Sequence, residues 1–579
     1  MVLRLAFENF QQIFEEISRE KTLLSCLLVC RSWCQIAAPI LWRRPLERSP
    51  TYKIIPVYLS CLSNTQINYL LENGVDMEYT RPTPVFNYLS FARHIDNANL
   101  EISALQWCAP HDSAIDRLKI LKHQFIDFTQ EQRRHALLIV QELLKGFLSQ
   151  CGTLRSINVE VGVDVASSWR NQISFSLPDI KGNDSVLLKL NKLVLGGTFD
   201  KTNFVKRLIG KCREIKYLSI DGLESEVSKE EPVALSQLIS SQNCLCHLKL
   251  TRYHGDLSLV FASLIHHVNN IQTLELIGVN FGILSNASVY ALAACENLRS
   301  LILKGSFHLG EETTAPLSRA FYKLQFFSID EYHNQIPVDF IAGFLETTNE
   351  NLRYLKIHSS MNDNNPFPKE RILDTIIRCC PNLEYLELFQ LNDQEITSIL
   401  LSCNHLIDFI FGAEHGFEAN AFLEKLGLLL PPTLRYLKVD RYYGEWDCNY
   451  QALEYFLKIV HARLECFELP NIYDYFQDES EDPEDYVFVR PAVHLPRLRG
   501  PARRAARRLG IPAARIVPPV HPPHAPLIAD QETEEEDLSV DQSKKRQLNT
   551  AGLVSYYGLL PEYPVYRDQE LLSKYLNDF

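Results

Sequence analysis

Cysteines and histidines are the residues of this sequence whose spacing could support chemistry. Cys26, Cys30 and Cys34 recur every four residues, so one face of a helix could present three thiols to a metal ion. A tetrahedral site needs a fourth ligand, and no further cysteine or histidine stands at a suitable spacing. We therefore interpret these thiols as small apolar side chains of a hydrophobic core.

The remaining reactive residues do not form a recognised site either. Cys379-Cys380 lacks the C-x-x-C spacing of redox pairs, and His266-His267 ends an expected helix, where both rings fit a surface position. The sequence contains no P-loop, no G-x-G-x-x-G, no G-x-S-x-G and no H-E-x-x-H. We predict that the chain is not an enzyme and binds no metal or cofactor.

Length and charge restrict the class of protein further. The chain has 579 residues, more than one compact core accommodates, so several domains or a repeat array are expected. The net charge of −13 argues against a general nucleic-acid or membrane-surface role. No apolar run is long enough to span a bilayer, and Glu8 and Gln11 interrupt any signal peptide. We expect a cytoplasmic or nuclear protein whose cysteines are free thiols.

Residues 1–46 show the pattern of a small helical module. Apolar residues recur at steps of three and four, which indicates one buried helix face; they are Phe7, Phe10, Ile13, Phe14 and Ile17. A polar break at 18–21 and a second apolar stretch that Pro39 limits follow. Three short helices are predicted, too few to form a stable domain alone.

The same segment resembles an F-box. The resemblance is carried by Leu5-Ala6-Phe7-Glu8, Ile13-Phe14, Leu24, Val29-Cys30-Arg31-Ser32-Trp33 and Leu41-Trp42. The family usually opens with Leu-Pro, whereas this chain has Leu5-Ala6, which leaves the entry turn less restricted. The resemblance implies binding to the Skp-type adaptor, and through it to a cullin, by Leu5, Ile13, Phe14, Leu24, Val29, Trp33, Leu41 and Trp42. Alternatively, several of these residues are simply the core of the small bundle.

A strand motif, L-x-x-L-x-L, recurs from residue 151 to residue 473. Its lead residues are Leu154, Leu190, Ile215, Leu245, Ile271, Leu298, Leu324, Leu352, Leu383, Leu406, Leu434 and Leu464. Most of the intervals are close to the 20–29 residues typical of leucine-rich repeats, and amphipathic segments lie between the strands. We predict an α/β fold, a right-handed leucine-rich-repeat solenoid of about twelve repeats, curved like a horseshoe with its strands on the concave side.

Cysteines recur three residues before the lead residue, at Cys151, Cys212, Cys295, Cys380 and Cys403. A recurring position indicates a recurring pocket, into which a small thiol packs well. This spacing resembles the cysteine-containing repeats of F-box proteins. Together with the N-terminal module, it makes the chain similar to F-box/leucine-rich-repeat proteins of the fungal type.

Strand positions three and five, counted from the lead residue, should point to the concave face because side chains alternate along a strand. Aromatic rings flanked by charges of both signs are typical of protein-recognition surfaces. The candidate target-binding residues are Tyr217, Lys249, Glu275, Phe326, Tyr354, Lys356, Tyr385, Glu387, Tyr436 and Lys438. The alternative is that neighbouring rings stack into a purely structural ladder.

The flanking regions are less regular. Residues 47–150 are predicted to form an irregular cap or linker, with a strand motif at Phe86-x-x-Leu89-x-Phe91. Residues 474–550 form an acidic, Arg-rich and Pro-rich tail that we predict to be disordered. Its Arg497–Arg515 block could bind nucleic acid, but pairing with the flanking acids is favoured, so nucleic acid is not an expected partner. The aromatic segment 551–579 could dock on the solenoid.

The resemblance therefore implies a substrate-recognition subunit of an SCF-type E3 ubiquitin ligase. The F-box would bind the adaptor and the repeats would hold a target protein, which the sequence does not identify. The alternative is a ubiquitin-independent leucine-rich-repeat scaffold in which the first helices only cap the array.

Overall fold

The computed structural model describes much of the chain up to residue 469. The described residues are 7–17, 20–44, 46, 51–77, 84–108, 128–152, 154–160, 186–196, 201–222, 230–253, 255–306, 308–309, 315–331, 337–359, 369–414, 416–440 and 448–469. All of them belong to the first of two compact units, Met1–Ala514, and not to the second, Arg515–Phe579. The predictions for residues 474–550 and 551–579 lie outside the described residues.

Three helices form an N-terminal bundle, as the apolar spacing predicts: α1 (Phe7–Glu15), α2 (Glu20–Leu27) and α3 (Arg31–Leu41). The bundle has its own small core, which includes Phe14, Leu23 and Ile36. The ring of Phe14 packs edge-on against Trp33, with centroids 5.0 Å apart. Pro39 lies inside α3, which continues for two more residues.

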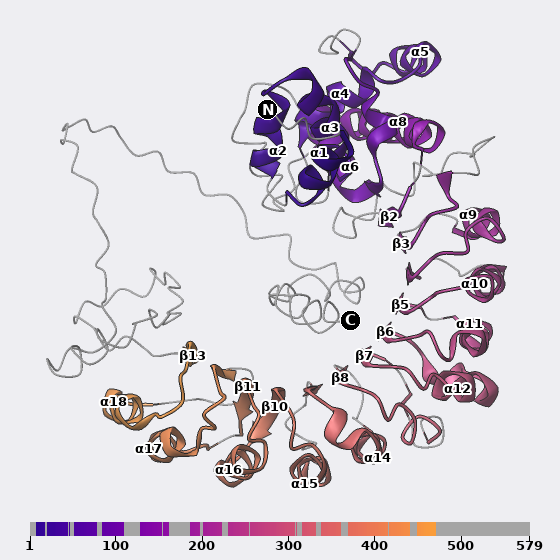
Figure 1. Ribbon diagram of the computed structural model, residues 1–579. Coiled ribbons are helices and arrows are strands. Elements are labelled where there is room, and N and C mark those ends of the chain that lie inside the picture. The colour runs from indigo at the N-terminus through magenta and orange to yellow at the C-terminus, as the bar shows by residue number, and fades with distance from the viewer. Residues whose placement is uncertain are drawn as a thin grey trace, which may run out of the picture. The chain divides into compact units, whose positions relative to one another are not determined.

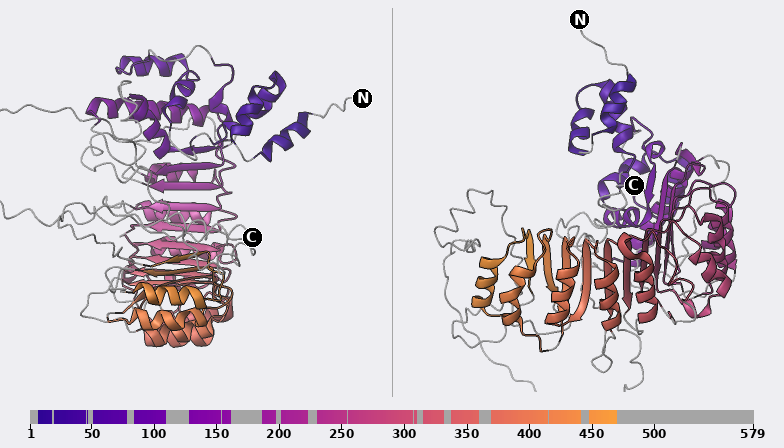
Figure 2. Two further views of the ribbon diagram at one scale, coloured as in Figure 1. Left: turned by 90° about the vertical axis from the view of Figure 1, so that its left-hand side faces the viewer. Right: turned by 60° about the horizontal axis from the view of Figure 1, so that its bottom comes forward.

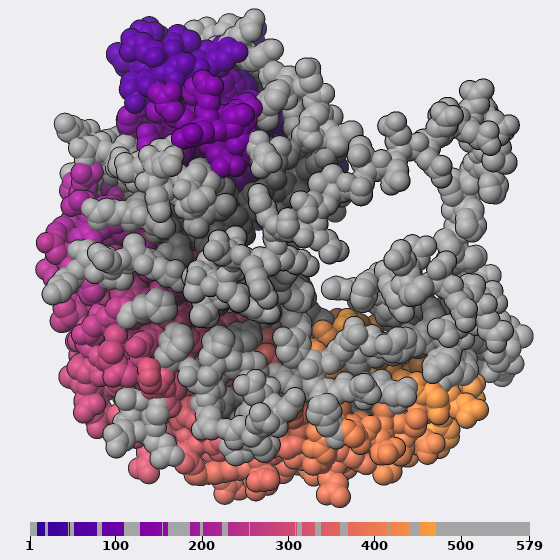
Figure 3. Space-filling view, turned by 180° about the vertical axis from the view of Figure 1, so that it is seen from behind, coloured from indigo at the N-terminus to yellow at the C-terminus, as the bar shows by residue number. Residues whose placement is uncertain are grey.

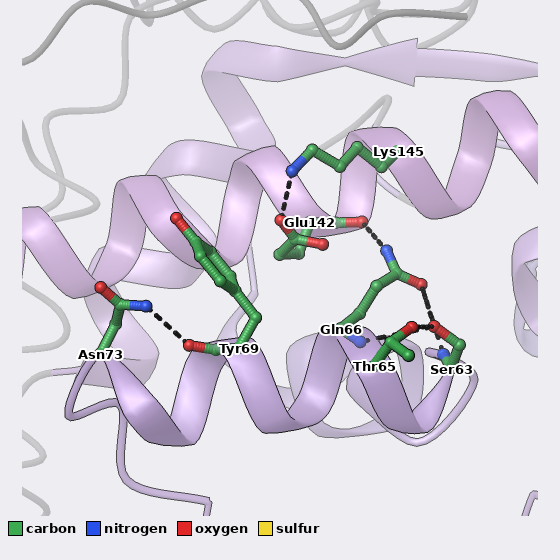
Figure 4. Close-up of polar contacts among 7 residues, drawn as sticks. All are labelled: Ser63, Thr65, Gln66, Tyr69, Asn73, Glu142 and Lys145. Carbon is green, nitrogen blue, oxygen red and sulfur yellow. Dashed lines mark hydrogen bonds and ion pairs between the residues drawn. The ribbon is translucent and has the colours of Figure 1, made fainter. Parts of the chain in front are cut away.

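A helical region connects the bundle to the sheet. It contains η1 (Tyr52–Ile54), α4 (Ile55–Leu59), α5 (Asn64–Glu72), η2 (Tyr88–Phe91), β1 (His94–Asp96), α6 (Asn97–Cys108) and α8 (Gln130–Gln150). Figure 4 shows how α5 is held on α8: the Gln66 side chain donates to the Glu142 carbonyl at 3.0 Å. Lys145 in turn pairs with the Glu142 carboxylate at 2.5 Å.

The prediction of a strand at Phe86–Phe91 is wrong. Residues Tyr88–Phe91 form a 3-10 helix, and the strand of this region, β1, follows at His94–Asp96. Ala92 and Asn97 occupy the buried sites that leucines fill in other repeats, with 0 % and 1 % exposure. The leucine pattern therefore does not reveal this repeat.

The thirteen strands among the described residues form one parallel sheet in strict chain order. After β1 come β2 (Ser156–Glu160), β3 (Lys192–Gly196), β4 (Tyr217–Asp221), β5 (His247–Thr251), β6 (Thr273–Ile277), β7 (Ser300–Lys304), β8 (Phe326–Glu331), β9 (Tyr354–Ser359), β10 (Tyr385–Leu391), β11 (Asp408–Ala413), β12 (Tyr436–Asp440) and β13 (Cys466–Glu468). Because each strand pairs only with its sequence neighbours, the fold is built from successive local units.

Helices lie on one side of this sheet. They are α9 (Lys201–Leu208), α10 (Glu230–Ser240), α11 (Ser258–Ser263), η5 (Leu264–His267), η6 (Phe281–Ile283), α12 (Asn286–Ala293), α14 (Val338–Thr348), η7 (Asn349–Asn351), α15 (Glu370–Cys379), α16 (Asp393–Ser402), α17 (Ala419–Leu429) and α18 (Tyr450–Ile459). Figures 1 and 2 show the strands along the inner side and the helices along the outer side of a curved array. In the space-filling view of Figure 3 the described repeats succeed one another in chain order.

The lead residues explain why this stacking is stable. All twelve are buried, eleven of them completely, and Leu464 in the last repeat retains 8 % exposure. The cysteines three positions earlier are buried as well, and the Cys151 thiol donates to the Leu89 carbonyl of the preceding repeat at 3.1 Å. Asparagines directly before the lead residue add a side-chain ladder, since Asn297 and Asn382 donate to carbonyls one repeat earlier at 2.9 and 3.1 Å.

A core substitution in the middle of the array should therefore be costly. Leu355 in β9 is fully buried, whereas Leu401 at the end of α16 is 62 % exposed. We expect Leu355→Ala to lower the free energy of unfolding by about 2–5 kcal/mol. The matched control Leu401→Ala should change it by less than about 0.5 kcal/mol. Urea unfolding followed by circular dichroism measures both, and equal effects of the two changes would contradict this packing.

Candidate functional site

The N-terminal bundle exposes large apolar side chains that its own core does not use. Ile13 on α1 and Leu24 on α2 are 50 % and 49 % exposed. Leu28 and Val29, in the turn between α2 and α3, are 89 % and 59 % exposed. Apolar side chains gathered on so small a module are characteristic of a surface that another protein covers.

The residues predicted for adaptor binding differ in their burial. Ile13, Leu24 and Val29 are at the surface, whereas Phe14, Trp33 and Leu41 pack in the small core of the bundle. Leu5 lies outside the described residues. The sequence prediction did not include Leu28, although its place in the run Leu27-Leu28-Val29 just before α3 could have suggested it.

Trp42 lies elsewhere, although the resemblance grouped it with Leu41. Its ring packs against Tyr58 and Tyr88, with centroid distances of 5.3 and 4.5 Å, at the edge of the large core of the array. The structure therefore places Trp42 between the bundle and the repeats.

The predicted target-binding residues come together on the inner side of the sheet. The register aligns position three of successive strands in one row, as in Phe326, Tyr354 and Tyr385. Position five forms a second row, in which Lys249 stands beside Glu275. Because alternate side chains point to opposite faces, both rows lie on the face opposite the helices.

The charges of the second row pair with each other across neighbouring strands. Lys249 lies 3.4 Å from Glu275, Lys356 lies 3.1 Å from Glu387, and Lys438 lies 3.8 Å from Glu468. These pairs are spaced along the array, with Ile302 and Ile410 at the same position between them. The row therefore presents balanced charge rather than a patch of one sign.

The Glu275 carboxylate has a lowered pKa. Burial raises its pKa, but a contact with the His247 ring at 3.0 Å and the charge of Lys249 outweigh this and lower the pKa to about 2. The His247 ring in turn stacks on Tyr217 with centroids 4.2 Å apart, and the Lys192 ammonium lies 4.7 Å from the Tyr217 centroid. Glu275 thus lies at the end of a continuous row of contacts on the inner face, which runs from Lys192 through Tyr217 and His247.

The aromatic residues of the first row stack on each other. The Phe326 and Tyr354 rings are 3.8 Å apart and inclined by 13°, and the Tyr354 and Tyr385 rings are 4.0 Å apart and inclined by 10°. All three are at most 5 % exposed. This geometry is that of the structural ladder considered as the alternative, whereas Tyr436 is only partly buried.

The described residues contain no group of three or more His, Cys, Asp or Glu that could hold a metal ion. Cys26 is buried, Cys30 is exposed and Cys34 is half-buried, so the three thiols do not share one environment. In the array, burial raises the pKa values of Cys151 and Cys212 to about 12, which keeps these thiols protonated.

Comparison with known proteins identifies one region. A family described as F-box-like matches residues 8–48, which cover all of the bundle's three helices except Phe7 and also include Trp42. No curated protein matches the chain. The protein thus has an F-box-like domain followed by an α/β array with a thirteen-stranded parallel sheet. No helix among the described residues is long and apolar enough to cross a membrane.

The lowered pKa of Glu275 predicts how its contribution depends on pH. A carboxylate with a lowered pKa stabilises the fold above its ordinary pKa near 4.5, and this stabilisation is lost as the pH falls towards about 2. Glu275→Gln should therefore destabilise the chain most at neutral pH, and the difference from the parent should shrink steadily below pH 4.5.

Urea unfolding of the parent and the variant between pH 7 and pH 2.5 measures this difference. Glu296→Gln, which neutralises an exposed carboxylate, controls for the loss of one negative charge. A Glu275→Gln effect that does not change with pH would contradict the assigned contacts.

Proposed function

We propose that this chain is a substrate-recognition subunit of an SCF-type E3 ubiquitin ligase, similar to F-box/leucine-rich-repeat proteins of the fungal type. The observation that carries the proposal is the F-box-like match at residues 8–48 on a bundle whose α1, α2 and following turn expose apolar side chains. Ile13, Leu24, Leu28 and Val29 would contact the Skp-type adaptor, which in turn binds the cullin.

The construction of the bundle favours docking over a purely structural role. A cap would turn its apolar side chains towards the array, but Leu28 and Val29 are mostly exposed. The bundle also has a core separate from that of the array, so its packing does not complete the large core. Burying the four exposed side chains in a partner would contribute about 1.5–3 kcal/mol for each fully covered residue.

The array would then hold the target protein. We regard it as a leucine-rich-repeat solenoid, because parallel strands in chain order alternate with helices on one side. Tyr436, Lys438 and Lys249 are the proposed contacts, since they are only partly buried. Balanced charge on this face does not favour a polyanion, so the expected target is a protein met in the cytoplasm or nucleus.

Adaptor binding tests the proposal directly. The double substitution Ile13→Asp and Val29→Asp should weaken binding of the purified chain to a Skp-type adaptor by at least about 100-fold, because two apolar contacts become buried charges. Folding should be unchanged, since both side chains already face solvent. Gel filtration and isothermal titration calorimetry measure the complex.

A matched control adds the same charges to exposed leucines far from the bundle. Leu401 and Leu428 are exposed on α16 and α17. The double variant Leu401→Asp, Leu428→Asp should bind the adaptor with the affinity of the parent chain. A folded parent chain that does not bind adaptor would reject the ligase role and favour the scaffold.

The alternative scaffold role predicts a different response to deletion of the bundle. A chain beginning at Trp42 retains Trp42 and Leu46, both of which pack in the large core of the array. If the bundle is a docking module, this chain should melt within about 2 °C of the full-length protein, whereas a chain beginning at residue 47 should melt several degrees lower. If the bundle is a cap, the chain beginning at Trp42 should already be clearly destabilised. Differential scanning calorimetry distinguishes the two.

A further inference from the structure

Each unit of the sheet begins with the same two backbone hydrogen bonds. The carbonyl of position two accepts N–H groups from positions two and three of the next repeat, as Arg93 accepts from Arg155 and Ser156 at 2.8 and 3.1 Å. One repeat earlier, Arg93 and His94 donate in the same way to the carbonyl of Arg43, at 3.0 and 3.3 Å. Arg43 therefore occupies position two of a partial repeat that precedes β1.

The same residue closes the last helix of the F-box-like domain. The N–H of Arg43 donates to the Ile40 carbonyl at 3.3 Å, which continues the final turn of α3. Trp42, directly after α3, stands at the lead position of the partial repeat and packs on Tyr58 and Tyr88. The end of the bundle is thus bonded directly to the first strand of the sheet.

An electrostatic contact adds to this joint. Arg43, Arg93 and Arg155 follow one another at position two of successive repeats, so three cations stand in one row. Glu15, the last residue of α1, lies 2.8 Å from the Arg43 guanidinium. Hydrogen bonds from Arg43 and Gln11, together with the charges of Arg43 and Arg155, hold the pKa of Glu15 below its usual value. A carboxylate of the bundle therefore offsets repulsion within a row of cations on the array.

We propose that Glu15, Trp42 and Arg43 are positioning residues that hold the adaptor-binding helices at one orientation relative to the inner face of the sheet. A rigid joint confines a bound target to a small region near the adaptor and so raises its effective concentration there. This benefit rests on the proposed ligase function. The joint itself requires neither adaptor nor target and can be tested in the isolated chain.

The test is a distance measurement across the joint. Nitroxide side chains are introduced through a non-canonical amino acid at two exposed positions, Gln12 on α1 and Gln237 on α10. Double electron–electron resonance should give one narrow distance distribution for the parent. Glu15→Arg, which replaces this carboxylate with a fourth cation beside the row, should broaden the distribution at least twofold. The swapped pair Glu15→Arg with Arg43→Glu should narrow it again, because the opposite charges face each other once more.

Two further measurements make the outcome unambiguous. Circular dichroism establishes that each variant is folded, and hydrogen exchange at the Arg93 and His94 amides should become faster only in the variants whose distribution broadens. A broad distribution in the parent, or an unchanged narrow one in folded Glu15→Arg, would overturn the proposal. Adaptor affinity measured on the same variants tests the proposed function separately, because Glu15 is not among its contact residues.

Discussion

The burial of each repeat against its neighbours is the constraint on which the rest of this structure depends. A single strand and helix of this size cannot shield their own leucines from water, and only stacking makes a continuous core. The completely buried lead residues show this, as does Leu464, which retains some exposure in the last repeat. Local packing also explains why the strands follow strict chain order, since every unit folds onto the one just before it.

Stacking also determines how polar groups are accommodated on the inner face. A parallel sheet places equivalent positions of neighbouring repeats about 4.8 Å apart, so like charges at one position would repel along the whole row. Position five instead carries three Lys–Glu pairs separated by uncharged residues, and each Lys meets the carboxylate of the following strand. Position three uses flat rings in the middle of the array, where Tyr354 stacks on both neighbours.

Most of the array could be predicted from the sequence, because the leucine spacing directly encodes burial. The strand of His94–Asp96 could not, since Ala92 and Asn97 fill its core positions without a leucine. The same limit applies to Trp42: the sequence places it beside Leu41, but contacts with the distant Tyr58 and Tyr88 decide which core it joins. The Lys–Glu ion pairs on the inner face could not be predicted either, because they depend on the register between neighbouring strands rather than on the sequence of any single repeat.

The paired charges would restrict how the proposed target is recognised. A partner that competed for Lys356 would have to leave Glu387 as a nearly buried carboxylate without its ion pair, and such a loss costs several kcal/mol. Recognition should therefore add contacts to intact pairs rather than replace them. Since the balanced row produces little long-range field, association should be governed by shape and apolar contact rather than by electrostatic steering. Selectivity would then depend on the partly buried side chains of the inner face, such as Lys249 in β5 and Tyr436 in β12.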